Sequence, residues 1–235
     1  MTSAKSKKEA DHLETLVTLG NAFDRKIVRG IPGCYGDPDF TGKRVLDIGA
    51  QIGSFSVYAA WKGAKEIYAV EPLPRNIELL RKNTARYPQV RVYPAAAVKD
   101  TSIPRTITSG AEITDHDNSN FGHNVLRKTG EMRANSRTAQ HSVELVSFKE
   151  LLGFNPHIIK MDCEGSEHEL LEGYVASPIV EALLLEVHFF EWSMTRGWPQ
   201  RLKNLLDQGF KIVRGRESII NGTGQYGILT LLRDR

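Results

Sequence analysis

The chain contains little cysteine, no long apolar run and no large excess of one charge. Its two cysteines, Cys34 and Cys163, are too few and too far apart for a disulfide framework or a cysteine zinc cluster. No apolar stretch approaches the ~20 residues that a membrane helix needs, and the polar start does not look like a secretion signal. The net charge of +3 provides no basic stripe for a nucleic acid. We therefore expect a cytoplasmic protein with free thiols, no membrane association and no nucleic-acid partner.

What the chain does contain is a regular alternation of short apolar strands and helices. The predicted strands cover residues 44–49, 66–71, 90–98, 157–162 and 181–188. Strands this apolar, separated by helices such as 54–62 and 74–87, indicate a parallel sheet that is covered on both faces. After a helix over 199–208, the segments 210–215 and 226–232 flank a turn of glycine and asparagine, which predicts an antiparallel hairpin at the sheet edge. The predicted fold class is α/β and Rossmann-like.

Two regions lie outside this alternation. Apolar residues at near-helical spacing predict an amphipathic N-terminal helix over about 10–28, followed by a loop rich in glycine and proline. Residues 1–40 are thus predicted to cap a main domain over 41–235. Residues 101–142 are polar and turn-rich, which is typical of a functional insertion, a mobile loop or a short extra hairpin.

The segment VLDIGAQIGSF is a strand that ends in a glycine turn and continues into a helix. Gly49 and Gly53, with Gln51 between them, leave room for a ligand near the backbone, but their spacing fits neither a dinucleotide fingerprint nor a phosphate loop. The Asp47 carboxylate would repel a pyrophosphate, whereas it could hold an ammonium group. Glu71, at the tip of the second strand, is placed to accept hydrogen bonds from ribose hydroxyls. This combination favours S-adenosylmethionine as the cofactor. The alternative is that both carboxylates only cap loops.

Four segments of the chain form a series: VLDIGAQIGSFSVYAA, YAVEPLPRNIELLRKN, IIKMDCEGSEHELLEG and LLLEVH. This series resembles the successive motifs of the FkbM-type methyltransferases over roughly residues 42–190. The resemblance implies the class I methyltransferase fold, a mostly parallel seven-stranded sheet with a reversed last strand, and makes residues 41–235 a catalytic domain that binds S-adenosylmethionine. It also implies methyl transfer to oxygen, typically to a hydroxyl of a small natural product or a sugar. Gln51 stands where that family most often has asparagine.

The catalytic candidates follow the fourth and fifth strands, because ligands of open α/β sheets lie beyond the carboxyl ends of the strands. We predict that His188 is the general base that takes the acceptor's proton, and that Asp162 orients it through a hydrogen bond. Asp162 is also predicted to line the methionine end of the cofactor. Glu164 either contacts the substrate or favours a helix N-terminus electrostatically. The alternative for His188 is a structural histidine at a strand end.

Further predictions concern packing around these residues. Lys160 and Glu186 are expected to lie side by side as a buried ion pair, because each precedes a catalytic candidate by two positions on neighbouring strands. Ser166 and Glu169 have the spacing of a capping box, which would open a helix with an exposed first turn. The aromatic stretch over 189–198 forms either an apolar wall for the acceptor or part of the core.

No metal is predicted, because metal-dependent O-methyltransferases are expected to have an Asp-Asn pair on the fifth strand, where this chain has EVH. A nucleic-acid methyltransferase is a rival, although its usual Asn/Asp-Pro-Pro-aromatic turn is replaced here by DCEG. An N-methyltransferase of a small molecule or peptide is a second alternative, and a cofactor-binding protein without catalysis is a third. The favoured interpretation is a metal-independent O-methyltransferase with a small-molecule acceptor.

Overall fold

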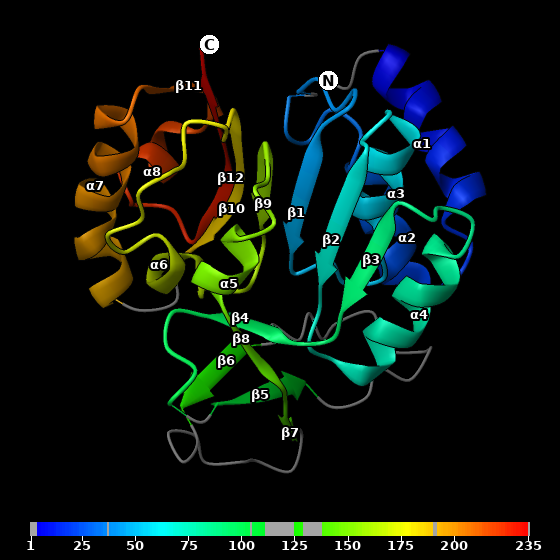
Figure 1. Ribbon diagram of the computed structural model, residues 1–235, viewed down its shortest axis with the longest axis horizontal. Helices are drawn as coiled ribbons and strands as arrows, with labels where there is room; N and C mark the ends of the chain where they lie inside the picture. The colour runs from blue at the N-terminus through cyan, green and yellow to red at the C-terminus, as the bar shows by residue number, and fades with distance from the viewer. Residues whose placement is uncertain are drawn as a thin grey trace.

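A seven-stranded sheet forms the centre of the molecule, in a computed structural model that describes residues 4–36, 38–103, 105–110, 125–128, 138–189 and 192–234 (Figure 1). The strand order is β11-β12-β10-β9-β1-β2-β3. The five strands from β10 to β3 run parallel, and β12 and β11 are antiparallel to their neighbours. The predicted fold class is confirmed. The strand bounds are β1 Arg44–Ile48, β2 Glu66–Val70, β3 Val90–Tyr93, β9 Ile158–Met161, β10 Ala182–His188, β11 Phe210–Gly215 and β12 Tyr226–Arg233.

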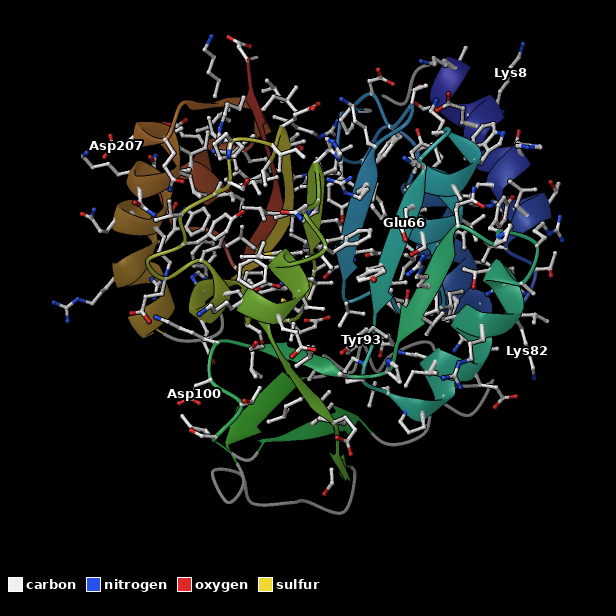
Figure 2. The ribbon with its side chains drawn as sticks, in the orientation of Figure 1. Lys8, Glu66, Lys82, Tyr93, Asp100 and Asp207 are labelled. Carbon is white, nitrogen blue, oxygen red and sulfur yellow. The ribbon has the colours of Figure 1, made fainter. Side chains whose placement is uncertain are left out.

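Helices cover both faces of this sheet because successive strand residues point to opposite sides. Val45 and Leu184 pack toward one core, which includes α1 (Ala4–Leu16), α2 (Ala22–Gly30) and α3 (Ser54–Trp61). Leu46 and Leu185 pack toward the other core, with α5 (Phe148–Leu152), α6 (Glu167–Leu170), α7 (Trp192–Asp207) and α8 (Glu217–Ile220). Helix α4 (Pro74–Thr84) lies beside α3. Charged side chains such as Lys8, Lys82 and Asp207 project from the periphery (Figure 2). Within the described residues, no helix has the length and apolar character needed to span a bilayer.

The N-terminal segment is two helices rather than the single helix predicted over about 10–28. The break falls before Asn21, whose side chain accepts a hydrogen bond from the backbone of Asp24 at 2.9 Å while Asp24 accepts one from the backbone of Asn21 at 2.8 Å. This reciprocal capping box starts a new helix at Ala22. Leu13 of α1 and Val28 of α2 are buried in the same core as the central sheet.

Two small sheets lie beyond the carboxyl ends of β1, β2 and β3, whose arrowheads point toward them in Figure 1. The predicted strand over 90–98 is split at Pro94, which has no N–H for a ladder. Its second part, β4 (Ala96–Val98), pairs with β8 (Leu145–Ser147). Within the predicted insertion, β5 (Arg105–Gly110) pairs with β6 (Val125–Lys128) and β7 (Thr138–Ser142). Residues 111–124 and 129–137 of that insertion lie outside the described part of the chain.

The C-terminal hairpin agrees with the sequence prediction, since β11 and β12 pair antiparallel. Strand β12 lies between β11 and β10, so the hairpin extends the sheet from its β10 side. The preceding helix α7 begins at Trp192 and includes Pro199, whereas the sequence predicted a start at Pro199. The proline therefore marks a position within the helix and not its first turn.

Candidate active site

The face of the sheet that points toward α1, α2 and α3 changes from apolar to charged along three neighbouring strands. Near the strand starts this face carries Val45, Ile158 and Leu184, all of them buried. Because side chains on one face recur every second residue, the same face continues toward the carboxyl ends with charged or ionisable groups. These groups are Asp47 on β1, Lys160 and Asp162 at the end of β9, and Glu186 and His188 on β10.

A cavity of about 590 Å³ opens at these carboxyl ends, which is within the range of small-ligand pockets. Of the residues predicted to bind the cofactor, those that line it are Gly49, Gln51, Glu71 and Asp162. The predicted catalytic residues Asp162, Glu164 and His188 line it too. Asp47 and Gly53 are absent from its wall. The predicted cofactor residues thus divide into four that line the cavity and two, Asp47 and Gly53, that do not.

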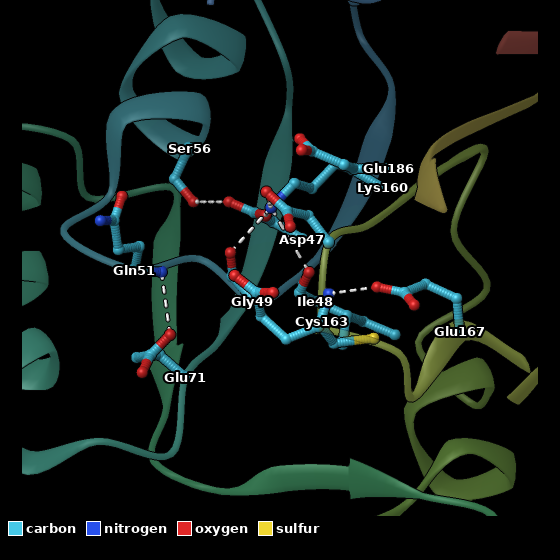
Figure 3. A network of polar contacts seen from close by, with 12 residues as sticks. Asp47, Ile48, Gly49, Gln51, Ser56, Glu71, Lys160, Cys163, Glu167 and Glu186 are labelled. Atoms are coloured by element: carbon cyan, nitrogen blue, oxygen red, sulfur yellow. Dashed lines mark hydrogen bonds and ion pairs between the residues drawn. The ribbon is translucent and has the colours of Figure 1, made fainter. Parts of the chain in front are cut away.

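Asp47 does not line the cavity, but it forms a buried ion pair with Lys160, which does. The two residues are register partners on β1 and β9, and Lys160 Nζ lies 3.2 Å from Asp47 Oδ1. Asp47 Oδ2 accepts a hydrogen bond from the Ser56 hydroxyl at 2.6 Å (Figure 3). Lys160 also donates to the carbonyl oxygen of Gly49 at 2.7 Å. Burial lowers the pKa of Lys160. The negative charges of Asp47 and the other nearby carboxylates raise it by more, so the net shift is upward.

The predicted pairing of Lys160 with Glu186 is wrong. The register of β9 and β10 places Lys160 beside Leu184, two positions before Glu186. Among the described residues, the ion-pair partners of Lys160 are Asp47 at 3.2 Å and Asp162 at 3.7 Å. Strand β10 extends beyond the end of β9. The two-residue spacing within each strand therefore did not place Lys160 and Glu186 at the same register position.

The turn between β1 and α3 requires three left-handed backbone conformations, at Gly49 (φ 77°), Gln51 (φ 50°) and Gly53 (φ 92°). A Cβ on Gly49 would lie 1.8 Å from the carbonyl oxygen of Asp162, so the ends of β1 and β9 can approach only at a glycine. A Cβ on Gly53 would instead meet the Leu80 side chain at 2.7 Å. Gly53 thus serves the packing of α3 against α4.

Gln51 is held in its left-handed conformation from two sides. Its backbone N–H donates to Glu71 Oε2 at 2.9 Å, as Figure 3 shows. Its side-chain Nε2 donates to Asp24 Oδ1 at 3.2 Å. Asp24 is buried on α2 and also lies 3.4 Å from Arg75 Nη2 of α4. The N-terminal helix α2 is therefore joined to the cavity turn through one carboxylate that the sequence reasoning missed.

Glu71 presents a buried carboxylate at the end of β2. Its Oε1 accepts hydrogen bonds from the backbone of Leu73 at 3.0 Å and from Asn76 Nδ2 at 3.2 Å. Its Oε2 accepts the bond from Gln51. Burial raises the pKa of Glu71 more than these donors lower it. Since each carboxylate oxygen can accept two hydrogen bonds, Oε2 retains a site for a donor from a ligand.

Ser54 is a further polar residue that lines the cavity. It is the first residue of α3, its side chain is buried, and its Oγ has no hydrogen-bond partner among the described residues. A buried hydroxyl without a partner is costly unless a ligand satisfies it. The helix N-terminus beside it also attracts negative charge. The position of Ser54 directly after the glycine turn was the signal in the sequence that could have identified it.

His188 lies at the centre of an acidic cluster at the opposite side of the cavity. Its Nδ1 lies 3.3 Å from Glu167 Oε1, and its Nε2 lies 3.5 Å from Glu164 Oε2 and 3.8 Å from Glu186 Oε1. The predicted hydrogen bond between His188 and Asp162 is therefore replaced by one between His188 and Glu167. The same two-residue offset in register explains this difference, because it moves Asp162 away from the ring of His188.

Glu167 was predicted to be exposed, but it is fully buried. It accepts hydrogen bonds from the backbone N–H groups of Cys163 at 2.7 Å (Figure 3) and Gly165 at 2.8 Å. Burial raises the pKa of Glu167, while the bond and charge of His188 lower it more, so the net shift is downward. Ser166 makes no capping bond, so the predicted capping box with Glu169 is also wrong.

His168 was predicted to lie on the exposed first turn of that helix, yet it is buried. Its Nε2 lies 2.6 Å from the carbonyl oxygen of His188. The chain enters the four-residue helix α6 through a tight turn with Glu164 at φ 53° and Gly165 at φ 97°. This turn directs the first residues of α6 inward, toward the end of β10.

The ionisable groups of the cluster have displaced pKa values. Burial lowers the pKa of His188, but the hydrogen bond and charge of Glu167, followed by Glu164 and Asp162, raise it to about 9. Burial and the charge of Asp162 raise the pKa of Glu186 to about 7. Potential ligand atoms of Asp162, Glu164 and His188 all lie within 4.8 Å of one another. Ion pairs from Glu164, Glu167 and Glu186 already surround His188, and we assign no metal to the cluster.

The aromatic residues after β10 belong to the core as far as they are described. Trp198 is fully buried, and its Nε1 donates to the carbonyl oxygen of Ile219 at 2.7 Å. Phe189 packs edge-on against Trp198, with ring centroids 5.8 Å apart. Neither residue lines the cavity. The prediction for Phe190 lies outside the described residues.

Solved structures of methyltransferases are among those that are similar to this chain. The chain is similar to methyltransferase FkbM from Methylobacillus flagellatus KT, with 15% identity and a TM-score of 0.51 over 96% of this chain and 59% of that protein. It is also similar to a putative RNA methyltransferase from Pyrococcus horikoshii, with 14% identity and a TM-score of 0.49 over 99% and 98% of the two chains. Fibrillarin from Aeropyrum pernix, solved with S-adenosyl-L-methionine, gives 12% identity and a TM-score of 0.45 over 85% and 70%.

The sequence itself matches the methyltransferase FkbM domain over residues 47–212. The chain belongs to this family, and it is an S-adenosylmethionine-dependent methyltransferase. The resemblance found in the sequence motifs is thereby confirmed. A search of curated proteins gave no match.

Proposed function

We propose that this chain transfers a methyl group from S-adenosylmethionine to a hydroxyl of a small molecule, such as a natural product or a sugar, that carries no negative charge. The observation that carries this proposal is the charge of the cavity wall. Its carboxyl groups are Glu71, Asp162, Glu164 and Glu186, whereas its basic groups are Lys26, Lys160 and His188. His188 is already paired with Glu167, which is not among the residues that line the cavity. Lys160 is already balanced by Asp47. Such a wall repels a phosphate backbone and tolerates neutral or cationic acceptors.

The donor groups of the cavity fit S-adenosylmethionine. The free hydroxyl of Ser54 and the N-terminus of α3 suit its carboxylate. The remaining acceptor site on Glu71 suits a ribose hydroxyl. Asp162 lines the same cavity and suits the cofactor's ammonium group. The bound cofactor supplies an electrophilic methyl group, so the protein mainly has to align the acceptor and accept its proton.

Asp162, Glu164 and His188 are proposed to surround the reacting atoms. Correct alignment of an acceptor can contribute roughly 7–11 kcal/mol to lowering a reaction barrier. A well-placed base adds about 10²–10⁴-fold. The carboxylates and the imidazole of the cluster lie at one side of the cavity, where both contributions can act on the same hydroxyl.

The test is transfer of a labelled methyl group to a panel of acceptors. Purified protein and labelled S-adenosylmethionine are incubated separately with hydroxylated metabolites, glycans, small amines, peptides and total RNA. We expect label in the hydroxylated small molecules or glycans. Glu71→Ala serves as the control, because it removes a cofactor contact and should abolish label in every fraction. Label confined to RNA would establish the nucleic-acid alternative, and label confined to amines or peptides would establish N-methylation.

A further inference from the structure

We infer that Glu186, and not His188, is the group that accepts the proton of the methyl acceptor. This inference rests on the proposed function, since it identifies the base for that reaction. Glu186 lies on the cavity face of β10, between buried Leu184 and His188, and it contributes directly to the cavity wall. The side chain is 25% exposed, so it can meet both an acceptor and solvent. The sequence pattern predicts only a structural ion pair for this residue.

His188 is unsuited to the task because both of its ring nitrogens face carboxylates. Nδ1 is bonded to Glu167, and Nε2 lies near Glu164 and Glu186. The raised pKa of about 9 keeps the ring protonated at neutral pH. A protonated imidazole has no lone pair with which to accept a proton. His188 therefore acts as a fixed cation within the cluster.

The other carboxylates of the cavity already have charged or hydrogen-bonding partners. Asp162 faces Lys160 at 3.7 Å, and Glu164 faces His188 at 3.5 Å. Glu71 receives three hydrogen bonds. By contrast, Glu186 receives no hydrogen bond from the residues that the structure describes, and its ion-pair contact is His188 at 3.8 Å. It keeps all of its acceptor sites for a substrate hydroxyl.

The surroundings of Glu186 adjust its proton affinity in opposite directions. If the register of β9 and β10 continues by two residues, Glu186 lies level with Asp162, whose charge opposes its ionisation. The cations Lys160 and His188 favour ionisation, and Glu164 opposes it. The effects of burial and of Asp162 are larger than those of the two cations, so the pKa of Glu186 is raised to about 7. A carboxyl group with this pKa can take up and release a proton near neutral pH. Among the described residues, Cys34 and Tyr35 in the loop before β1 also interact electrostatically with Glu186.

The step balances with the groups already named. An oxygen lone pair of the acceptor forms the new O–C bond to the methyl carbon. The C–S bond breaks, and its electron pair stays on sulfur to give the neutral thioether S-adenosylhomocysteine. The acceptor's proton passes to a carboxylate oxygen of Glu186. Because Glu186 is partly exposed, it can return that proton to solvent before the next turnover.

A first experiment needs no acceptor. The protein is labelled with ¹³C at glutamate side-chain carboxyl carbons and with ¹⁵N in histidine rings, and NMR titrations identify Glu186 and His188 by their loss in Glu186→Gln and His188→Asn. We expect the Glu186 carboxyl to titrate near 7 and the His188 ring to stay protonated to about 9. Titration of Glu186 near its ordinary 4.5, or a neutral His188 ring at pH 7, would overturn the inference.

A second experiment uses the acceptor found by the panel. Glu186→Gln should lower kcat at least about 10²-fold, leave the affinity for S-adenosylhomocysteine within about twofold, and remove the limb of the pH–rate profile near 7. Glu66→Gln is the matched control, because Glu66 is a strand glutamate with the same 25% side-chain exposure but lies outside the cavity wall. Glu186→Asp should recover part of the rate if the carboxylate is needed.

The results separate failure of this inference from failure of the proposed function. A rate-limiting pKa near 9 that disappears in His188→Asn, together with normal turnover of Glu186→Gln, would restore His188 as the base. Methylation of RNA or amines alone would refute the proposed acceptor, while the NMR titrations would still decide which group can accept a proton at pH 7.

Discussion

Asp47 and Lys160 face each other across the β1–β9 ladder, their charged atoms lie 3.2 Å apart, and both side chains are buried. Removal of one partner leaves the other charge buried and unpaired. We expect Lys160→Met to lower the free energy of unfolding by roughly 3–5 kcal/mol, as is typical of buried pairs. Urea denaturation measures this loss. Lys82→Met, which breaks the exposed pair with Glu78, is the control and should cost less than ~1 kcal/mol. A Lys160→Met protein as stable as the wild type would contradict the structural role.

Ser54→Ala tests the proposed carboxylate contact of the cofactor. A hydrogen bond to a charged group is worth about 1.5–3 kcal/mol, so the Kd for S-adenosylhomocysteine should rise about tenfold or more. Stability should not fall, because the Ser54 hydroxyl has no partner among the described residues. Ser56→Ala, two residues along the same helix, removes the bond to Asp47 and should reduce stability with little change in Kd. Calorimetry and denaturation together distinguish the two serines, and an unchanged Kd for Ser54→Ala would remove it from the cofactor site.

Asp24→Ala should weaken cofactor binding indirectly, because Asp24 holds Gln51 in the cavity turn. It releases the side chain of Gln51, whose left-handed backbone then loses one of its two restraints. We expect a rise of about tenfold in Kd, equivalent to about 1.4 kcal/mol. Asn21→Ala is the control, since it removes the cap of α2 at a cost of about 1 kcal/mol but leaves the contact between Asp24 and Gln51. Equal losses of affinity in both variants would attribute the effect to helix stability alone.

Stability should fall as pH rises from neutral to alkaline. The pKa of His188 is raised in the folded state, from an ordinary 6.5 to about 9. Its contribution is therefore complete below pH 6.5 and lost as pH rises through 9. At 1.36 kcal/mol per pKa unit the loss is about 3 kcal/mol. Urea denaturation at pH 6 and pH 9 should show it for the wild type, and a much smaller difference for His188→Asn and Glu167→Gln. The same pH dependence in all three proteins would contradict the assignment.

Activity should survive exhaustive chelation. A metal at Asp162, Glu164 and His188 would have to displace a proton from an imidazole held in three ion pairs. We therefore expect the rate of methyl transfer after treatment with a chelator to equal that of untreated enzyme. Loss of activity with rescue by Mg²⁺ would make these three side chains a metal site and favour a metal-dependent mechanism.

The sequence predicted the parts of the fold that depend on local pattern. The apolar runs that became β1, β9 and β10 could be located because buried parallel strands are apolar on both faces. The glycine turn around Gly49 and the carboxylate of Glu71 were recognisable because their positions relative to the strand ends are fixed by the backbone. These features placed one side of the cavity correctly.

The parts that failed depend on how separate segments align. Side-chain alternation predicts correctly that Lys160 and Glu186 lie on the same face of the sheet. It does not predict how far β10 is shifted along β9. The shift of two residues separates Lys160 from Glu186, so each of them has a different ion-pair partner. Glu167 was misplaced because α6 follows a turn with left-handed Glu164, which periodicity cannot reveal. Asp24 had no visible role, since its contact with Gln51 joins residues 27 positions apart.

The cavity extends beyond the part of the chain that matches the family. That match covers residues 47–212, yet Phe23 and Lys26 of α2 and Tyr226 of β12 stand in the cavity wall. We therefore expect these outer segments, which lie outside the family match, to contribute to the proposed acceptor site. It follows that selectivity among acceptors can diverge here at little cost to the common chemistry. A protein reduced to the matched residues would lose these parts of the cavity wall.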